Sequence, residues 1–126
     1  MNYLALSAAL GVVHVLAASA AASKQRSLKW NLGPRDESPP PLGKIPARFD
    51  RALKNFSETF PLFLGAVLGS FLLSQPLSEI ETGMALYFWG RVAYLPIYAL
   101  GIPVVRTLSW GVSMIGIAMI IWNGLT

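Results

Sequence analysis

The sequence has no cysteine and only one histidine among its 126 residues. The lack of cysteine excludes disulfides, thiolate metal sites and a thiol nucleophile of the protein's own. Any sulfur chemistry would therefore use a sulfur atom of the substrate. His14 has no carboxylate near it in the chain, which favours a packed histidine over a ligand or proton carrier. We accordingly predict no metal site.

Charge is scarce as well. Charged residues make up 13% of the chain and hydrophobic residues 54%, whereas about 25% of an average soluble domain is charged. A soluble fold is therefore not expected. The apolar residues gather in four runs, at 3–22, 60–74, 84–100 and 108–121.

These runs predict an all-α integral membrane protein, a bundle of four transmembrane helices in one domain over residues 1–126. A helix needs about 20 mainly apolar residues to cross a bilayer, and the second and fourth runs reach this length with their flanks. No basic side chain precedes the first run, so we expect a retained helix rather than a signal peptide. The predicted helices cover about 2–24, 48–75, 80–101 and 104–125, with a loop at about 25–47.

The charges that are present follow a topological pattern. Eight of the ten basic residues lie between the first two apolar runs, while the loop before the third run carries only Glu79 and Glu81. Cytoplasmic loops are rich in Lys and Arg. We therefore expect the long basic loop in the cytoplasm and both termini outside. With little soluble surface available, no nucleic-acid partner is expected.

A polar stripe opens the second predicted helix. Arg51, Asn55 and Glu58 have the spacing i, i+4 and i+7, which places them on one helix face with Lys54 beside them. One interpretation is a solvated helix end whose cations reach lipid headgroups. That interpretation explains the cations but not the amide and the carboxylate aligned with them. Further along, Gly65 and Gly69 are expected to allow close helix packing.

The third predicted helix has a second stripe, formed by Tyr87, Arg91, Tyr94 and Tyr98. A charged residue deep in an apolar run is costly and needs a partner. An ion pair of Arg91 with Glu58, Glu79 or Glu81 would provide one. Tyr94 and Tyr98 also suit ordinary interfacial aromatics.

Together with Arg106, the two stripes suit a small polyanion that also bears an amine and amides. Arginine and lysine bind carboxylates, glutamate binds an amine, and asparagine pairs with a peptide unit. A tyrosine hydroxyl can reach a thiol or carbonyl group. A glutathione-like peptide has this set of groups.

The sequence resembles the family of membrane-associated proteins in eicosanoid and glutathione metabolism (MAPEG), which includes microsomal glutathione transferases, leukotriene C synthase and microsomal prostaglandin E synthase. The resemblance covers nearly the whole chain, and the order and spacing of its motifs are fairly specific. They are Arg51-Ala52-x-x-Asn55-x-x-Glu58-x-x-Pro61, Arg91-x-x-Tyr94-x-x-x-Tyr98 with the following Arg106, and the turn Gly33-Pro34-Arg35-Asp36 of bacterial members.

The resemblance implies a homotrimer of four-helix bundles that binds glutathione as co-substrate between subunits near the cytoplasmic face. It implies that Arg106 stabilises the thiolate, assisted by Tyr98. The glutathione-contacting positions it implies are Arg26, Arg51, Lys54, Asn55, Glu58, Tyr94 and Tyr98. Lys54 replaces an arginine of some relatives, and Leu95 replaces a hydroxyl residue of the prostaglandin synthase, which argues against that isomerase activity.

The implied function is that of a membrane-bound glutathione transferase or peroxidase acting on lipophilic electrophiles or hydroperoxides that arrive through the lipid. A bacterial inner membrane is the expected location. The alternative is a small membrane protein without enzymatic activity, such as a scaffold or a transporter-associated subunit. The sequence leaves the electrophile, the choice between transfer and reduction, and the identity of the thiol open.

Overall fold

Each of the four apolar runs falls on one long helix, although the last two residues of the second run, 73 and 74, lie just beyond the end of its helix. The computed structural model describes residues 1–126, except for the side chain of Leu28. In chain order, its helices are α1 (Tyr3–Gln25), α2 (Leu28–Leu32), α3 (Lys44–Leu72), α4 (Leu77–Leu100) and α5 (Pro103–Leu125). The predicted all-helical class is confirmed, since the backbone described contains no strand.

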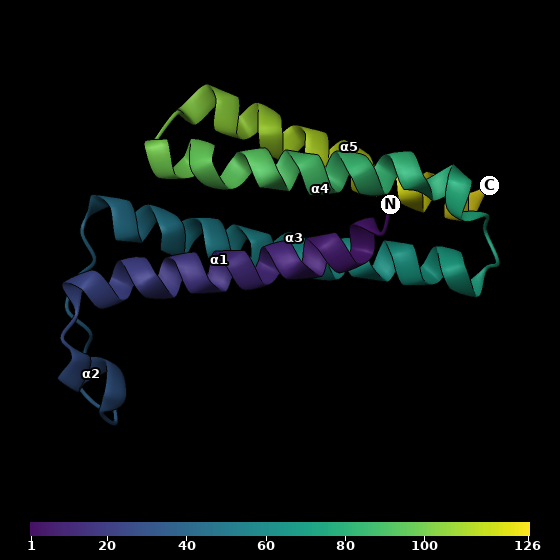
Figure 1. The fold of residues 1–126 in the computed structure, drawn as a ribbon. Coiled ribbons are helices and arrows are strands. Elements are labelled where there is room, and N and C mark those ends of the chain that lie inside the picture. Colours follow the sequence, from purple (N-terminus) through teal and green to yellow (C-terminus); the bar gives the residue numbers. More distant parts are fainter.

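The long helices are arranged in two layers (Figure 1). α1 lies beside α3 in one layer, and α4 lies beside α5 in the other. Successive long helices run in opposite directions, so both termini lie at one end and α2 projects from the other. Two contacts hold the terminal end. The amine of Met1 pairs with Glu81 at 2.9 Å, and Asn123 Nδ2 donates to the Glu79 carbonyl oxygen at 2.6 Å.

A buried aromatic pair lies at the centre of the core. The ring of Phe63 in α3 stacks on that of Tyr87 in α4, with centroids 4.0 Å apart and planes at 8°. In lipid, such packing is stabilised by close contact rather than by escape from water. The other buried members of this core are Val67, Ile80, Met84, Ile117 and Ile120.

Glycines let α4 and α5 approach closely. An ideal Cβ on Gly83 would lie 2.7 Å from the carbonyl oxygen of Gly116, and one on Gly116 would lie 2.5 Å from that of Gly83. Further along this contact, Ser109 Oγ donates to the Gly90 carbonyl oxygen at 2.6 Å. By contrast, a Cβ on Gly65 or Gly69 would meet nothing within 4 Å, so the expected close packing at these two glycines does not occur within one chain.

Two helices, α1 and α5, are long and apolar enough to cross a membrane. Each has 23 residues, about 34 Å at 1.5 Å per residue, against a hydrocarbon core of about 30 Å. Their outward faces are apolar, with Leu16 62% and Trp122 66% exposed. Charged side chains interrupt α3 and α4, so four membrane spans remain a prediction.

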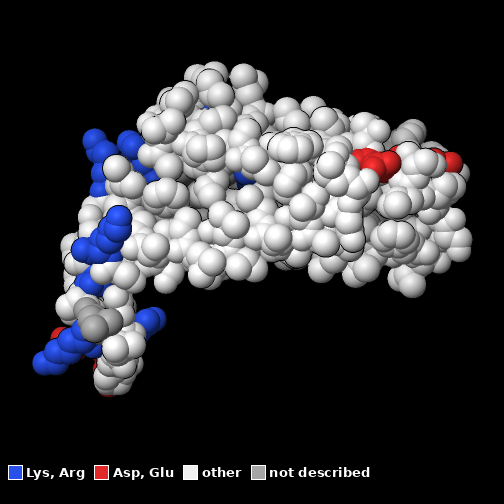
Figure 2. All heavy atoms as spheres, viewed as in Figure 1, with Lys and Arg blue, Asp and Glu red and all other residues white. Residues whose placement is uncertain are grey.

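Charge is concentrated at the ends of the bundle. Figure 2 shows Lys and Arg gathered, with a few acidic side chains, at the end that carries α2, while acidic side chains alone mark the terminal end and a largely uncharged surface separates the two ends. This distribution suits a protein whose middle lies in lipid.

The predicted loop at 25–47 contains a short helix and ends earlier than expected. Ser27 Oγ accepts a hydrogen bond from Trp30 N at 3.2 Å and caps the short helix α2. α3 begins at Lys44 rather than near 48, because Pro46 lies in the first turn, where its missing N–H costs no helical hydrogen bond. The non-helical residues of this region are 26–27 and the proline-rich part between α2 and α3.

Two other boundaries differ by three residues. α3 ends at Leu72 rather than 75, and α4 begins at Leu77 rather than 80. Pro76 directly precedes α4 with a φ of −60°, a value that suits entry into a helix. Pro61 lies inside α3 without ending it, as proline often does in membrane helices.

His14 is a packed residue, as expected. Its side chain is 1% exposed and stacks on Phe56 with ring centroids 4.5 Å apart. Nδ1 donates to the Leu10 carbonyl oxygen at 2.9 Å. The stacking joins α1 to α3, and the hydrogen bond identifies the protonated ring nitrogen, since a carbonyl oxygen can only accept.

Gly83→Ala should destabilise the fold, because its methyl group would overlap the α5 backbone at Gly116. We expect a loss of about 1–3 kcal/mol, typical of overpacking, measured by reversible unfolding in detergent. The matched control is Gly111→Ala, where an added Cβ meets nothing within 4 Å. Equal stability of the two variants would contradict the proposed tight contact.

Candidate functional site

The candidate site lies where α3 begins, α4 ends and α5 begins. Arg48 Nη1 donates to the Ala99 carbonyl oxygen at 3.2 Å and joins α3 to the last turn of α4. Gly101 then ends α4 in the left-handed region, with φ of 73°, a conformation that glycine adopts at low cost. An added Cβ there would also lie 2.6 Å from the Arg48 guanidinium. The tight turn brings α5 back beside α4.

Tyr98 lies between two guanidinium groups. Arg51 Nε donates to Tyr98 Oη at 3.0 Å. Arg106 Cζ lies 4.9 Å from the centre of the same ring, within the range of a cation–π contact. Since Oη accepts from Arg51, its own proton is available to another acceptor. The three residues come from α3, α4 and α5, so only the folded chain brings them together.

A cavity of about 320 Å³ opens beside this group. Its volume is near the lower limit of small-molecule sites. The residues that line it are Asn55, Tyr94, Tyr98, Arg106, Thr107 and Trp110. Four of these, all but Thr107 and Trp110, are among the predicted site residues.

Beneath the cavity lies Arg91, whose side chain is 0% exposed. Its Nη1 donates to Asn55 Oδ1 and its Nη2 to Thr59 Oγ1, both at 2.7 Å. The ring of Tyr94 lies 4.9 Å from the Arg91 guanidinium. An amide, a hydroxyl and an aromatic face thus surround the buried charge.

The predicted ion pair of Arg91 is therefore wrong. Glu79 and Glu81 lie 12 and 10 residues before it in α4, about 18 and 15 Å along the helix axis, and Glu81 pairs with the terminal amine instead. Glu58 is exposed on α3 and makes no ion pair with any residue that the structure describes.

Not all predicted residues meet in one place. Lys54 and Glu58 are exposed on α3 and do not line the cavity beside Tyr98. Arg26 borders a separate cavity of about 570 Å³ between α1, α2 and α3, together with Trp30, Asn31 and Asp50. Within one chain, the arginine at the end of α1 and the arginine of α5 thus face different spaces.

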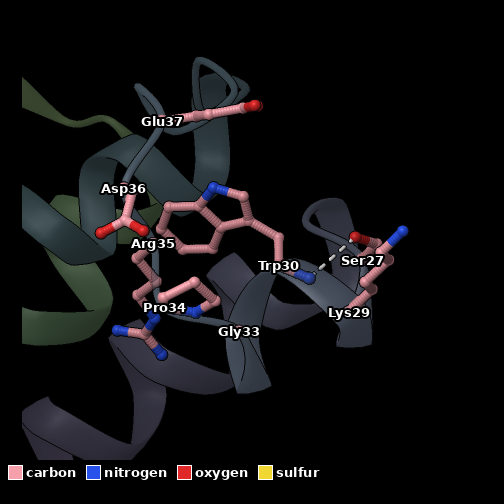
Figure 3. Close-up of a pocket in the computed structure, with 8 residues that line it drawn as sticks. All are labelled: Ser27, Lys29, Trp30, Gly33, Pro34, Arg35, Asp36 and Glu37. Atoms are coloured by element: carbon pink, nitrogen blue, oxygen red, sulfur yellow. Dashed lines mark hydrogen bonds between the residues drawn. The ribbon is translucent and has the colours of Figure 1, made fainter.

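The conspicuous turn Gly33-Pro34-Arg35-Asp36 organises α2. Arg35 has a left-handed φ of 58°, and its Nε and Nη2 both donate to the Asn31 carbonyl oxygen at 3.2 and 2.8 Å. The guanidinium groups of Arg26 and Arg35 lie 4.8 and 5.1 Å from the Trp30 ring centre. Figure 3 shows Trp30 and the turn around a cavity of about 410 Å³.

Several residues of the site were not predicted. Thr59 follows Asn55 by four residues and extends its stripe on α3, so the spacing contained a signal for it. Thr107 and Trp110 lie close to Arg106 in sequence but have no distinctive pattern. Arg48 had no distinctive sequence pattern either, because its partner is a backbone carbonyl group.

Comparison with known proteins identifies a family. A statistical model of the MAPEG family matches residues 3–126, essentially the whole chain. No curated protein matches the sequence significantly.

Thr59→Val should destabilise the protein while keeping its shape. Thr59 Oγ1 accepts from Arg91 Nη2 and lies 3.3 Å from Tyr87 Oη, so valine would leave a buried charged donor without its partner. We expect a loss of about 1–3 kcal/mol in unfolding measurements in detergent. Thr107→Val is the control, because its exposed hydroxyl contacts only its own helix, at Pro103. If the two variants lose equal stability, the Thr59 contact contributes nothing specific.

Proposed function

Because the chain belongs to the MAPEG family of membrane-associated proteins in eicosanoid and glutathione metabolism, we propose that it is a membrane-bound glutathione transferase with peroxidase activity. The family includes glutathione transferases and related enzymes. The single observation that carries the proposal is the position of Tyr98 between Arg51 and Arg106, at the edge of a cavity.

This arrangement suits stabilisation of a thiolate. A free thiol has a pKa near 8.5 and is mostly protonated at neutral pH. The Arg106 guanidinium favours the anion by charge, and the Tyr98 hydroxyl can donate a hydrogen bond to it. Arginine stays protonated and accepts no proton, so the thiol proton leaves to water. Lowering the pKa of the thiol by two units requires about 2.7 kcal/mol.

Both reactions follow from that thiolate. In conjugation, the sulfur forms a bond to an electrophilic carbon, and a leaving group departs with its electron pair or the carbanion of an acceptor double bond takes a proton from water. In reduction, the sulfur attacks the terminal oxygen of a hydroperoxide and breaks the O–O bond, which forms a sulfenic acid and releases an alcohol once the alkoxide takes a proton from water. A second thiol then converts the sulfenic acid to a disulfide and water.

The cationic end of the bundle suits recognition of glutathione. Arg51 and Lys54 are exposed there and can bind carboxylates. Glu58, also exposed, can pair with the ammonium group of the γ-glutamyl unit. Tyr94 packs beside Tyr98 with ring centroids 5.5 Å apart, and both residues line the same cavity.

We further propose that the site is shared between copies in a homotrimer. Arg26 and Arg106 border different cavities of one chain, so one ligand can contact both only if a neighbouring copy supplies one of them. The α3 surface supports self-association, since Gly65 and Gly69 face open space and let another helix approach closely.

The same proposal includes four membrane spans in a bacterial inner membrane. α3 and α4 have 29 and 24 residues, long enough for about 30 Å of hydrocarbon. The basic end (Figure 2) would lie in the cytoplasm and the termini outside. Lipophilic electrophiles would then reach the site from the bilayer.

Arg106→Ala should raise the pKa of the thiol of bound glutathione by about two units, since the charge that favours the thiolate is lost. The thiolate is measured by its ultraviolet absorbance as a function of pH. Conjugation of a lipophilic electrophile should fall at neutral pH and recover as the pH rises. Arg106→Lys keeps the charge, so the thiol pKa in this variant should lie between the values in the unaltered protein and in Arg106→Ala. An unchanged pH profile in Arg106→Ala would remove Arg106 from the mechanism.

Glu58→Gln should weaken glutathione binding about tenfold, because the ligand's ammonium group loses a charge-assisted hydrogen bond. Titration calorimetry in detergent measures the dissociation constant. Glu79→Gln is the matched control, since Glu79 lies at the terminal end of the bundle. Equal dissociation constants for the two variants would contradict the assignment of Glu58. Absence of any thiol binding by the unaltered protein would favour the scaffold alternative.

A further inference from the structure

The contact between Arg91 and Asn55 determines which way the Asn55 amide faces. Arginine carries only hydrogen-bond donors. Its Nη1 lies 2.7 Å from Asn55 Oδ1, so the carbonyl oxygen of the amide must be the atom that faces the guanidinium. Turning the amide over would place an NH₂ group against another donor and leave a charged N–H without an acceptor in an apolar bundle.

Arg91 itself is held firmly, so it can impose this orientation. Its side chain is completely buried, and its Nη2 donates to Thr59 Oγ1 at 2.7 Å. The rings of Tyr94 and Tyr87 lie 4.9 and 5.8 Å from its guanidinium. A side chain fixed on three sides cannot move to a different position, and because it carries only donors it cannot accept a hydrogen bond from the NH₂ end of the amide.

The opposite end of the Asn55 amide is then a pair of N–H donors. Asn55 is half-buried and lines the cavity that Tyr98 and Arg106 also line. Within the described part of the chain, no side chain or backbone group accepts a hydrogen bond from Asn55 Nδ2. Its two N–H groups are therefore available to a bound molecule.

We propose that Arg91 is a positioning residue which holds Asn55 as a hydrogen-bond donor, so that the cavity selects a hydrogen-bond acceptor of the thiol substrate at this position. The inference rests on the proposed function. In glutathione, the group that Asn55 binds is a carboxylate or peptide carbonyl oxygen, and a peptide N–H is excluded. Tyr98 and Arg106 present donors to the same space, so the three residues form an acceptor-binding wall.

Asn55→Asp tests the orientation directly. An aspartate oxygen can still accept from Arg91, now as an ion pair, but its second oxygen presents an acceptor to the ligand in place of the NH₂ group. We expect the thermal unfolding temperature in detergent to stay equal or rise, while the dissociation constant for glutathione increases about 10- to 100-fold. A residue with a merely structural role would not separate stability from binding in this way.

Ser57→Asp controls for the added negative charge. Ser57 is exposed on α3, two residues from Asn55, and lines a different cavity. If Asn55→Asp weakened binding only because its negative charge repels an anionic ligand, Ser57→Asp would weaken glutathione binding as much as Asn55→Asp. Equal losses in the two variants would overturn the proposal, and so would unaltered binding by Asn55→Asp.

Arg91→Gln provides an independent arm if Asn55→Asp does not fold. Glutamine can present either a donor or an acceptor to Asn55, so the amide is no longer held one way. We expect the KM for glutathione to rise about threefold to tenfold, with the pH profile of the bound thiol unchanged because Tyr98 and Arg106 remain. An unchanged KM would overturn the inference. Failure of the unaltered protein to bind glutathione would instead overturn the proposed function.

Discussion

A buried arginine with no carboxylate partner is the constraint on which the site depends. Arg91 lies in the middle of an apolar helix, where an unpaired charge is costly. The bundle compensates with two short hydrogen bonds from α3, to Asn55 and Thr59, and with aromatic rings from its own helix. These contacts set the rotation of α3 against α4. They thereby decide which side chains of each helix face the cavity above.

The chemistry of the cavity follows from that arrangement. Once α3 and α4 are in register, Arg51 reaches the Tyr98 hydroxyl, and the glycine turn at Gly101 brings Arg106 onto the same ring. Two cations beside one phenol create a place where negative charge is favoured. The buried Arg91 holds the Asn55 amide, while the exposed Arg51 and the half-buried Arg106 are left to face a ligand. A cation that orients the amide can be buried in the bundle, whereas a cation that binds a ligand must lie where the ligand can reach it.

The proposed homotrimer would bring together residues that lie apart within one chain. Arg26 faces one cavity and Arg106 another, and the exposed faces of α1 and α5 are apolar. Lipid or another copy must cover such faces. Under the proposed function, a site divided between subunits would couple activity to oligomerisation, because Arg26 and Arg106 would then come from different copies.

The sequence by itself determined the helical class, the position of the four apolar runs and the stripes of Arg51, Asn55 and Glu58 and of Arg91, Tyr94 and Tyr98, because helical periodicity is a local property. It did not determine the partner of Arg91. Only the tertiary structure showed that Asn55 and Thr59, rather than a glutamate, satisfy that charge, since hydrogen bonds between helices depend on rotation and depth. The same holds for Arg48 and Trp110, whose contacts come from elements that meet only when the chain folds.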